Sequence, residues 1–250
     1  MLAKDIPAHE SDFRRTGIDS NGKRHILTPL TVDIPGDDRQ LTVMRCRPET
    51  GDTSFYYQQE FVKERVVLHF TAGYMKGDIA TLTRPNWHVS VPFVIARDGT
   101  IYNLWSSSYW SYHLGQNAVG GNTPMSQKSV AIEISNIGPL RQEGNRLYTI
   151  YDSQYCDLNE RQYYRNGNYR GYQYFATFTD EQYESLILLL RYITGRYSIP
   201  RRFLPEAIRY DVRQDVPFFY GIVSHVNFRQ DKVDIGPVFD WQRVIDGVRA

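Results

Sequence analysis

The chain has 250 residues, of which 41% are hydrophobic, and its formal net charge is +1. These apolar residues suffice for one sizeable core, and a near-neutral charge gives no general attraction to nucleic acid or to an anionic membrane. No apolar run approaches the roughly 20 residues of a membrane span, and residues 1–15 lack the apolar stretch of a signal peptide. We therefore expect a protein synthesised as a soluble cytoplasmic protein, with no nucleic-acid or membrane partner. The oligomeric state stays open, with a monomer favoured.

The cysteines and tyrosines bear on possible disulfides and on possible ligands. Cys46 and Cys156 lie far apart and outside any C-x-x-C pattern, which favours two ordinary thiols over a disulfide framework. The 19 tyrosines offer flat apolar faces with a polar tip, which suit contacts with sugars and peptides as well as cores.

The first half of the chain contains the clearest strand signals. Residues 1–60 are polar and without regular pattern, and we expect an N-terminal extension packed on a domain formed by residues 61–250. The apolar run at 65–70 predicts a strand, and 76–83 predicts a short helix or turn that Pro85 ends. A second apolar run, residues 89–96, meets Asp98-Gly99 and predicts a β-hairpin, because glycine supplies the positive φ of its turn.

The second half alternates a strand, an insertion and helices. Residues 129–135 predict a strand that carries Glu133 between two isoleucines, so that its side chain leaves the apolar face. Residues 141–178 are tyrosine-rich and predict a surface insertion, with a hairpin around "RNGN"; this insertion lines a glycan groove or forms a packed flap, two interpretations that the residues leave open.

The remaining elements are helical. Residues 179–199 predict the longest helix, with a Thr179/Gln182 capping box and an end at Gly195. A shorter helix is expected after Pro200, and 239–250 predicts an amphipathic helix. Strands alternating with helices indicate an α/β class, a single domain with a central mixed β-sheet flanked by helices.

An imidazole at the end of the 65–70 strand is the first candidate for chemistry. His69 is either a core histidine with satisfied nitrogens or a ligand held at the rim of a cleft. His225 also follows a short apolar segment, and Asp234 comes nine positions later. Two imidazoles and a carboxylate match the three protein ligands of a catalytic zinc site, although the spacing alone lacks a local clamp such as H-E-x-x-H.

Five segments, taken in order, carry a family resemblance. They are "VVLHFTAG", "VSVPFVIARDGTIYNL", "SYHLG", "SVAIEISNIG" and "SHVNFRQDKVDIGPVFDW". Together they resemble the zinc-dependent N-acetylmuramoyl-L-alanine amidases, the family of phage amidase lysozymes, bacterial muropeptide amidases and peptidoglycan recognition proteins. The resemblance covers about residues 64 to 245 and is interrupted by the tyrosine-rich insertion.

The resemblance implies a role for each matched residue. His69, His225 and Asp234 match the zinc ligands, and Lys232 matches a catalytic lysine. Glu133 matches the general base of one branch of the family.

A second branch of the family uses a tyrosine followed by a histidine on the hairpin strand. Val91 and Pro92 stand at those positions in this chain, and this departure favours the glutamate mechanism.

Four further residues are expected to contact the substrate. The family block that "SYHLG" resembles places its histidine beside the cleft without binding metal, which makes His113 and its neighbour Tyr112 candidates. Thr71 and Asn136, which follow the two matched strands, complete the set.

The function that the resemblance implies is hydrolysis of the amide between N-acetylmuramic acid and L-alanine in peptidoglycan or muropeptides, with Zn²⁺ as cofactor. Such an enzyme would act on the cell wall after lysis or delivery. The alternatives are a non-catalytic muropeptide recognition module and a zinc amidase with another amide substrate. Non-catalytic members lose a metal ligand, whereas all three matched positions are present here, which favours catalysis.

Overall fold

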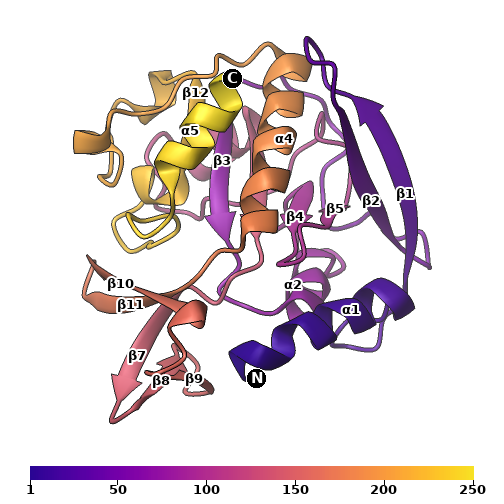
Figure 1. The fold of residues 1–250 in the computed structure, drawn as a ribbon. Helices are drawn as coiled ribbons and strands as arrows, with labels where there is room; N and C mark the ends of the chain where they lie inside the picture. Colours follow the sequence, from indigo (N-terminus) through magenta and orange to yellow (C-terminus); the bar gives the residue numbers. More distant parts are fainter.

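The computed structural model describes residues 1–250, which form twelve β-strands and five α-helices (Figure 1). The strands are β1 His25–Asp33, β2 Gln40–Pro48, β3 Arg65–Phe70, β4 Phe93–Ile95, β5 Ile101–Asn103, β6 Ser129–Ile134, β7 Pro139–Glu143, β8 Arg146–Thr149, β9 Gln154–Asp157, β10 Tyr164–Tyr169, β11 Tyr172–Ala176 and β12 Gly221–Ser224. The α-helices are α1 Ile6–Thr16, α2 Met75–Leu82, α3 Asn122–Gln127, α4 Asp180–Tyr197 and α5 Trp241–Arg249. Short 3-10 helices lie at η1 Ala3–Asp5, η2 Arg161–Tyr163, η3 Glu206–Ile208, η4 Val216–Phe218 and η5 His225–Asn227.

The central sheet is mixed and has seven strands in the order β1-β2-β5-β4-β6-β3-β12. Strands β4, β6, β3 and β12 are mutually parallel, and the β4–β5 and β1–β2 pairs are antiparallel. Helices α4 and α5 cover one face of the sheet, as Figure 1 shows. Helices α1 and α2 pack on the other face, so the predicted α/β class with a central mixed sheet is confirmed.

Alternation along the strands divides the apolar residues between the two faces. In β3, Val66 and Leu68 join the large core under α4 and α5, whereas Val67 belongs to a separate core on the opposite face. In β6, Ile132 lies in the large core and Ala131 lies opposite. Successive side chains of a strand point to opposite faces. His69, which follows Leu68, and Glu133, which follows Ile132, therefore face away from α4.

Most of residues 1–48 are regular, contrary to the prediction of an irregular extension, whereas residues 49–60 contain no helix or strand. The regular part forms α1 and the β1–β2 hairpin, and β2 pairs in parallel with β5, so this segment extends the central sheet. Strand β1 is the edge strand and contains Pro29, a residue that an edge position tolerates because its missing N–H faces no neighbour.

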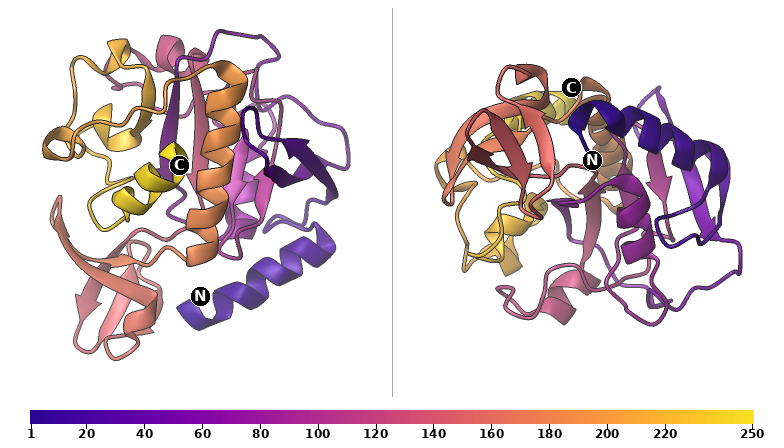
Figure 2. Two further views of the ribbon diagram at one scale, coloured as in Figure 1. Left: turned by 45° about the horizontal axis from the view of Figure 1, so that its top comes forward. Right: turned by 90° about the horizontal axis from the view of Figure 1, so that it is seen from below.

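The tyrosine-rich insertion folds into a second, antiparallel sheet in the order β10-β11-β7-β8-β9. This small sheet projects from the end of the molecule where α1 begins (Figure 2, left), and Ala3 and Ile6 pack against its apolar side. The "RNGN" segment, expected at a hairpin turn, lies inside β10. Gly167 serves close packing there, since a β-carbon would lie 2.2 Å from Val238, and the turn falls at Arg170-Gly171.

Two helix predictions also need correction. The capping box of α4 is present, with both reciprocal hydrogen bonds between Thr179 and Gln182, but the helix passes through Gly195 to Tyr197 and ends at a left-handed Ser198. Gly195 instead allows close approach, because a β-carbon there would lie 2.9 Å from the Pro35 carbonyl oxygen. The segment after Pro200 forms only 3-10 turns.

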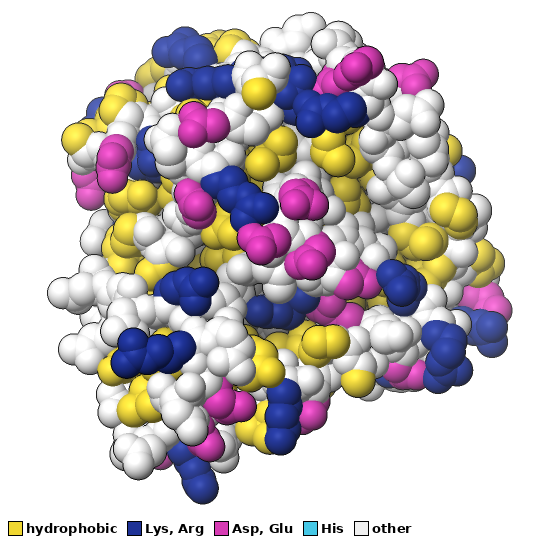
Figure 3. Space-filling view, viewed as in Figure 1, with side chains coloured by type: hydrophobic (Ala, Val, Ile, Leu, Met, Phe, Trp, Pro, Cys, Tyr) yellow, Lys and Arg dark blue, Asp and Glu magenta, His cyan; other side chains and the backbone are white.

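Basic and acidic side chains are intermixed on the face that carries α4 and α5 (Figure 3). Cys46 and Cys156 are both buried and unpaired. None of the helices combines the length and the apolar character needed to cross a membrane.

Candidate active site

The site is built at the carboxyl ends of three adjacent parallel strands, β6, β3 and β12. His69 of β3 pairs directly with Glu133 of β6, and Ser224, the last residue of β12, pairs with Leu68. His225 therefore follows β12 at the level of His69. In α/β sheets, ligands bind at the carboxyl ends of parallel strands, because loops there leave a crevice.

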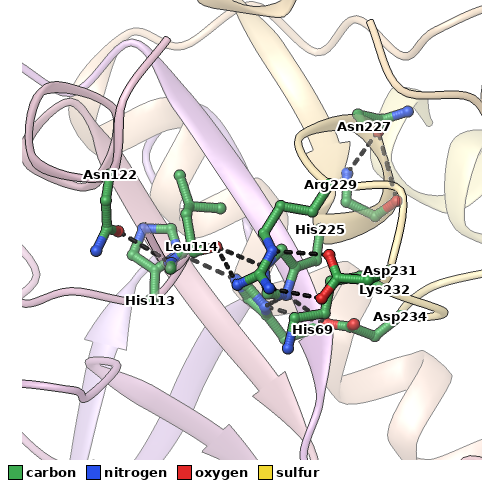
Figure 4. Close-up of polar contacts among 12 residues, drawn as sticks. His69, His113, Leu114, Asn122, His225, Asn227, Arg229, Asp231, Lys232 and Asp234 are labelled. Carbon is green, nitrogen blue, oxygen red and sulfur yellow. Dashed lines mark hydrogen bonds and ion pairs between the residues drawn. The ribbon is translucent and has the colours of Figure 1, made fainter. Parts of the chain in front are cut away.

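His69, His225 and Asp234 converge on one point (Figure 4). The two Nδ1 atoms lie 3.0 Å apart, and Asp234 Oδ2 lies 3.1 Å from His69 Nδ1 and 3.0 Å from His225 Nδ1. Ligand atoms on a tetrahedron with bonds of ~2.0 Å are separated by about 3.3 Å. All three residues are buried, so this set of donors fits a small divalent cation.

Hydrogen bonds on the far side of each imidazole orient its lone pair. His225 Nε2 lies 3.0 Å from the Leu114 carbonyl oxygen; since a carbonyl only accepts, Nε2 carries the proton and Nδ1 keeps its lone pair. His69 Nε2 lies 3.0 Å from His113 Nδ1, which can accept in the same way. Such partners fix tautomer and ring orientation at metal sites.

The pKa values of His69 and Asp234 suit metal ligands with lone pairs available at neutral pH. Burial, followed by the nearby His225, lowers the pKa of His69 to about 4. Burial raises the pKa of Asp234, but the contacts with His225 and His69 outweigh it, and the net pKa lies well below the ordinary range. An imidazole and a carboxylate in these states can both donate to a cation.

Glu133 stands beside this cluster on the same face of the sheet. Burial, reinforced by the negative charges of Asp234 and Asp78, raises its pKa well above the ordinary value, and Lys232 opposes the shift. Its Oε2 atom is buried and has no hydrogen-bond partner in the protein. Because a buried unpaired carboxyl oxygen is costly, the arrangement suits a group that exchanges a proton with a molecule entering the cleft.

Lys232 lies on the loop between His225 and Asp234, and both ends of this loop are fixed. Val226 N donates to the Asp234 carbonyl at 3.0 Å, which closes the loop. Arg229 forms a bidentate ion pair with Asp231 and donates to the Leu114 carbonyl at 3.3 Å (Figure 4).

These residues line a cleft of about 650 Å³, the size of a small-ligand pocket. Of the predicted site residues, the cleft is lined by His69, Thr71, His113, Glu133, His225, Lys232 and Asp234.

Tyr112 and Asn136, predicted as substrate contacts, lie outside the cleft lining. Tyr112 packs edge-on against Tyr57 and Trp110. Asn136 is buried, and its amide bonds the backbone of Gly138 and Thr177 at 2.8 and 2.9 Å, so it joins the end of β6 to the end of the insertion.

The sequence left open whether the tyrosine-rich insertion lines a groove or forms a packed flap, and in the structure this insertion forms one wall of the cleft. The small sheet contributes Ile150, Tyr151, Arg170 and Tyr172, and Val89 stands among the other lining residues. Tyr151 is 64% exposed and Ile150 43% exposed, unusual values for large apolar residues beside a polar centre. The tyrosine-rich composition of the insertion was the only available signal.

The fold and the site together define a class: an α/β protein whose His-His-Asp cluster, with the geometry of a metal site, shares a cleft with one carboxyl group and one ammonium group. The model of the N-acetylmuramoyl-L-alanine amidase family matches residues 62–237. The chain belongs to this family.

Individual relatives agree with this assignment. N-acetylmuramoyl-L-alanine amidase AmiD of Escherichia coli (strain K12) is 26% identical over 200 residues, which cover 77% of this chain and 56% of AmiD. This chain therefore spans little more than half the length of that relative.

Among solved structures, AmiD from E. coli in complex with anhydro-N-acetylmuramic acid-L-Ala-D-γ-Glu-L-Lys has a TM-score of 0.50 at 22% identity, covering 87% of this chain and 65% of that one. AmpDh3 from Pseudomonas aeruginosa, in complex with an anhydromuramic pentapeptide, has a TM-score of 0.48 at 18% identity and covers 78% and 65% of the two chains.

Proposed function

We propose that this protein hydrolyses the amide bond between the lactyl group of N-acetylmuramic acid and L-alanine in peptidoglycan or muropeptides. Membership of the family supports the reaction class. The single observation that carries the proposal is the convergence of His69, His225 and Asp234 in one cleft with Glu133 and Lys232. Residues 61–250 would form the amidase domain, with residues 1–60 as an extension of its sheet.

We infer that the cation is zinc. Two imidazole nitrogens and one carboxylate oxygen form a common ligand set of catalytic zinc sites, which keep a fourth position open for water or substrate. When bound, zinc lowers the pKa of water and polarises a carbonyl group as a Lewis acid.

Glu133 is the group placed to move protons in this reaction. Its carboxylate takes a proton from the attacking water, and the resulting acid returns it to the amine of L-alanine as the C–N bond breaks. The unpartnered Oε2 and the raised pKa support this assignment, because the group holds a proton more readily than an exposed glutamate.

Lys232 supplies a positive charge in the cleft that contains His69, His225 and Asp234. Negative charge develops on the amide oxygen as the carbonyl carbon becomes tetrahedral, and a fixed ammonium group stabilises it. His113 also lines the cleft, and burial, followed by the charges of His69 and His225, holds its pKa well below the ordinary value. A neutral His113 offers hydrogen bonds to substrate without competing as a cation.

The size of the cleft and a solved relative support a muropeptide as substrate. A volume of about 650 Å³ accommodates part of a sugar and the first residues of a stem peptide. AmiD was solved with an anhydromuramyl tripeptide, which carries the scissile bond of the proposed reaction.

Digestion of purified peptidoglycan tests the proposal. We expect free stem peptides that begin with L-alanine, and glycan strands of unchanged length, when the soluble products are separated and weighed by mass spectrometry. New reducing sugar ends without new amino termini would show a glycosidase instead. Binding without any product would show a recognition module.

A further inference from the structure

The tip of the β10–β11 hairpin has an unusual residue in its turn. Tyr169 pairs with Tyr172, so the loop consists of Arg170 and Gly171 alone, and their φ angles are 48° and 87°. Two-residue hairpin turns with positive φ at both positions favour asparagine, aspartate or glycine at the first. Arginine is strained there, and a strained residue points to a role for its side chain.

The guanidinium of Arg170 binds the loop that carries the catalytic residues. Nη1 donates to the Arg229 carbonyl at 3.0 Å and also to the Lys232 carbonyl. Nη2 donates to the Val226 carbonyl at 3.4 Å and to the Tyr210 carbonyl at 3.3 Å. Three of these four carbonyls lie between His225 and Asp234.

The neighbouring tyrosine extends the same contact. Tyr169 donates its hydroxyl to the Tyr210 carbonyl at 3.0 Å. Its ring covers Gly236, where a β-carbon would lie 2.6 Å from the ring. The hairpin thus contacts backbone on both sides of Asp234.

The opposite side of the loop is held independently. Arg229 bonds the Leu114 carbonyl, the same oxygen that accepts the proton of His225 Nε2. The loop is therefore fixed between the His113–Leu114 segment on one side and the small sheet on the other. Without Arg170, the support from the small sheet is reduced to the contacts of Tyr169.

We propose that Arg170 is a positioning residue: the insertion holds the 225–236 loop through it, and so sets the placement of Asp234 and Lys232. The inference rests on the proposed function in that it treats these two residues as metal ligand and catalytic group. It assigns the tyrosine-rich insertion a part in organising the centre as well as in lining the cleft.

Arg170→Asn is the informative variant, because asparagine suits the first turn position and keeps the hairpin while removing the guanidinium. Arg141→Asn is the matched control. Arg141 lies in β7 of the same small sheet, forms ion pairs with Glu143 and Asp152 at the surface, and lies over the ring of Tyr148.

The first readouts need no substrate. Zinc affinity is measured by competition with a chelator, and the visible absorption of the Co²⁺-substituted protein reports ligand geometry. We expect Arg170→Asn to weaken zinc binding by roughly 10-fold to 100-fold, the usual effect of losing support around a metal ligand, and to alter the Co²⁺ spectrum. Arg141→Asn should match the wild type in both.

Kinetics on a soluble muropeptide separate positioning from substrate contact. A positioning role lowers kcat with little change in KM. A raised KM with unchanged zinc affinity would make Arg170 a substrate contact and overturn the inference. A lowered melting temperature alone, with wild-type zinc affinity and spectrum, would overturn it as well. If no muropeptide is cut by the wild type, the proposed function fails, and the metal measurements still decide the role of Arg170.

Discussion

His69 and Glu133 occupy directly paired positions on the adjacent parallel strands β3 and β6, and both side chains face away from α4 and α5. The sheet itself therefore holds a proposed cation ligand beside the group proposed to move protons. Strand-borne residues are held more rigidly than loop residues, which favours a reproducible distance between the two functions.

Replacement of His225 by alanine tests the metal centre. We expect about one zinc per chain in the wild type and little in the variant, because two ligands rarely retain zinc at a catalytic site. His9→Ala is the control, since His9 lies on α1 and accepts a hydrogen bond from Lys76 N at 3.2 Å. Metal analysis after gel filtration measures both, and equal zinc in the wild type and His225→Ala would rule out this ligand set.

Glu133→Gln keeps the shape of the side chain but cannot accept a proton. We expect kcat to fall by ~100-fold to 10,000-fold, the usual contribution of general acid–base catalysis, with zinc content unchanged. Glu184→Gln, at an exposed position of α4, provides the control. If zinc-loaded Glu133→Gln keeps a kcat near that of the wild type, Glu133 does not transfer the proton. His113 would then be the next candidate.

Lys232→Met retains the aliphatic stem and removes the charge. Loss of one group that stabilises an oxyanion costs on the order of 100-fold to 1,000-fold in kcat, and zinc affinity should change little because the side chain is not a ligand. Lys128→Met, whose ammonium pairs with Glu64 at the surface, is the comparison. A rise in KM with constant kcat would show that Lys232 binds substrate only.

A buried glutamate of α1, Glu10, should make the free energy of unfolding depend on pH. Glu10 is 2% exposed, and burial, followed by the charge of Asp98, raises its pKa from 4.5 to about 7. Between these two values the folded protein holds a proton that the unfolded chain has released, so the free energy of unfolding falls as the pH rises through this window.

Glu10→Gln should remove this contribution and raise the free energy of unfolding at pH 8 by at most about 3 kcal/mol, the equivalent of a rise in pKa from 4.5 to about 7. Urea unfolding at pH 5 and pH 8 measures the effect. Glu143→Gln, at an exposed site, should leave the change in the free energy of unfolding between pH 5 and pH 8 as in the wild type. An identical change in Glu10→Gln and the wild type would show that Glu10 does not titrate in this range.

The sequence indicated the candidate ligands individually because their signals are local. His69 and His225 each end a short apolar strand, and Glu133 interrupts an otherwise apolar one, so alternation alone aims these side chains at one face. Their common location follows from strand order. No strand order could be predicted from the sequence, and only the family resemblance indicated that these residues share one site.

The errors arose where the structure depends on distant contacts. Strand β1 was missed because an edge strand is half solvated and tolerates Pro29. Asn136 resembled a site residue because it is polar and follows a strand, but its amide serves buried backbone groups. The role of Arg170 depends on carbonyls some 60 residues away, and no local pattern reports such a contact.

Hydrolysis of an anhydromuramyl tripeptide in water enriched in ¹⁸O tests the central claim most directly. Attack of water on the proposed amide places the heavy oxygen in the lactyl carboxylate of the sugar and none in the peptide. We predict a sugar product heavier by one substituted oxygen and an unlabelled tripeptide with a free L-alanine amine, formed by zinc-loaded protein and lost on chelation. Label in a peptide carboxylate, label at a sugar carbon, or the absence of product from zinc-loaded protein would contradict the account.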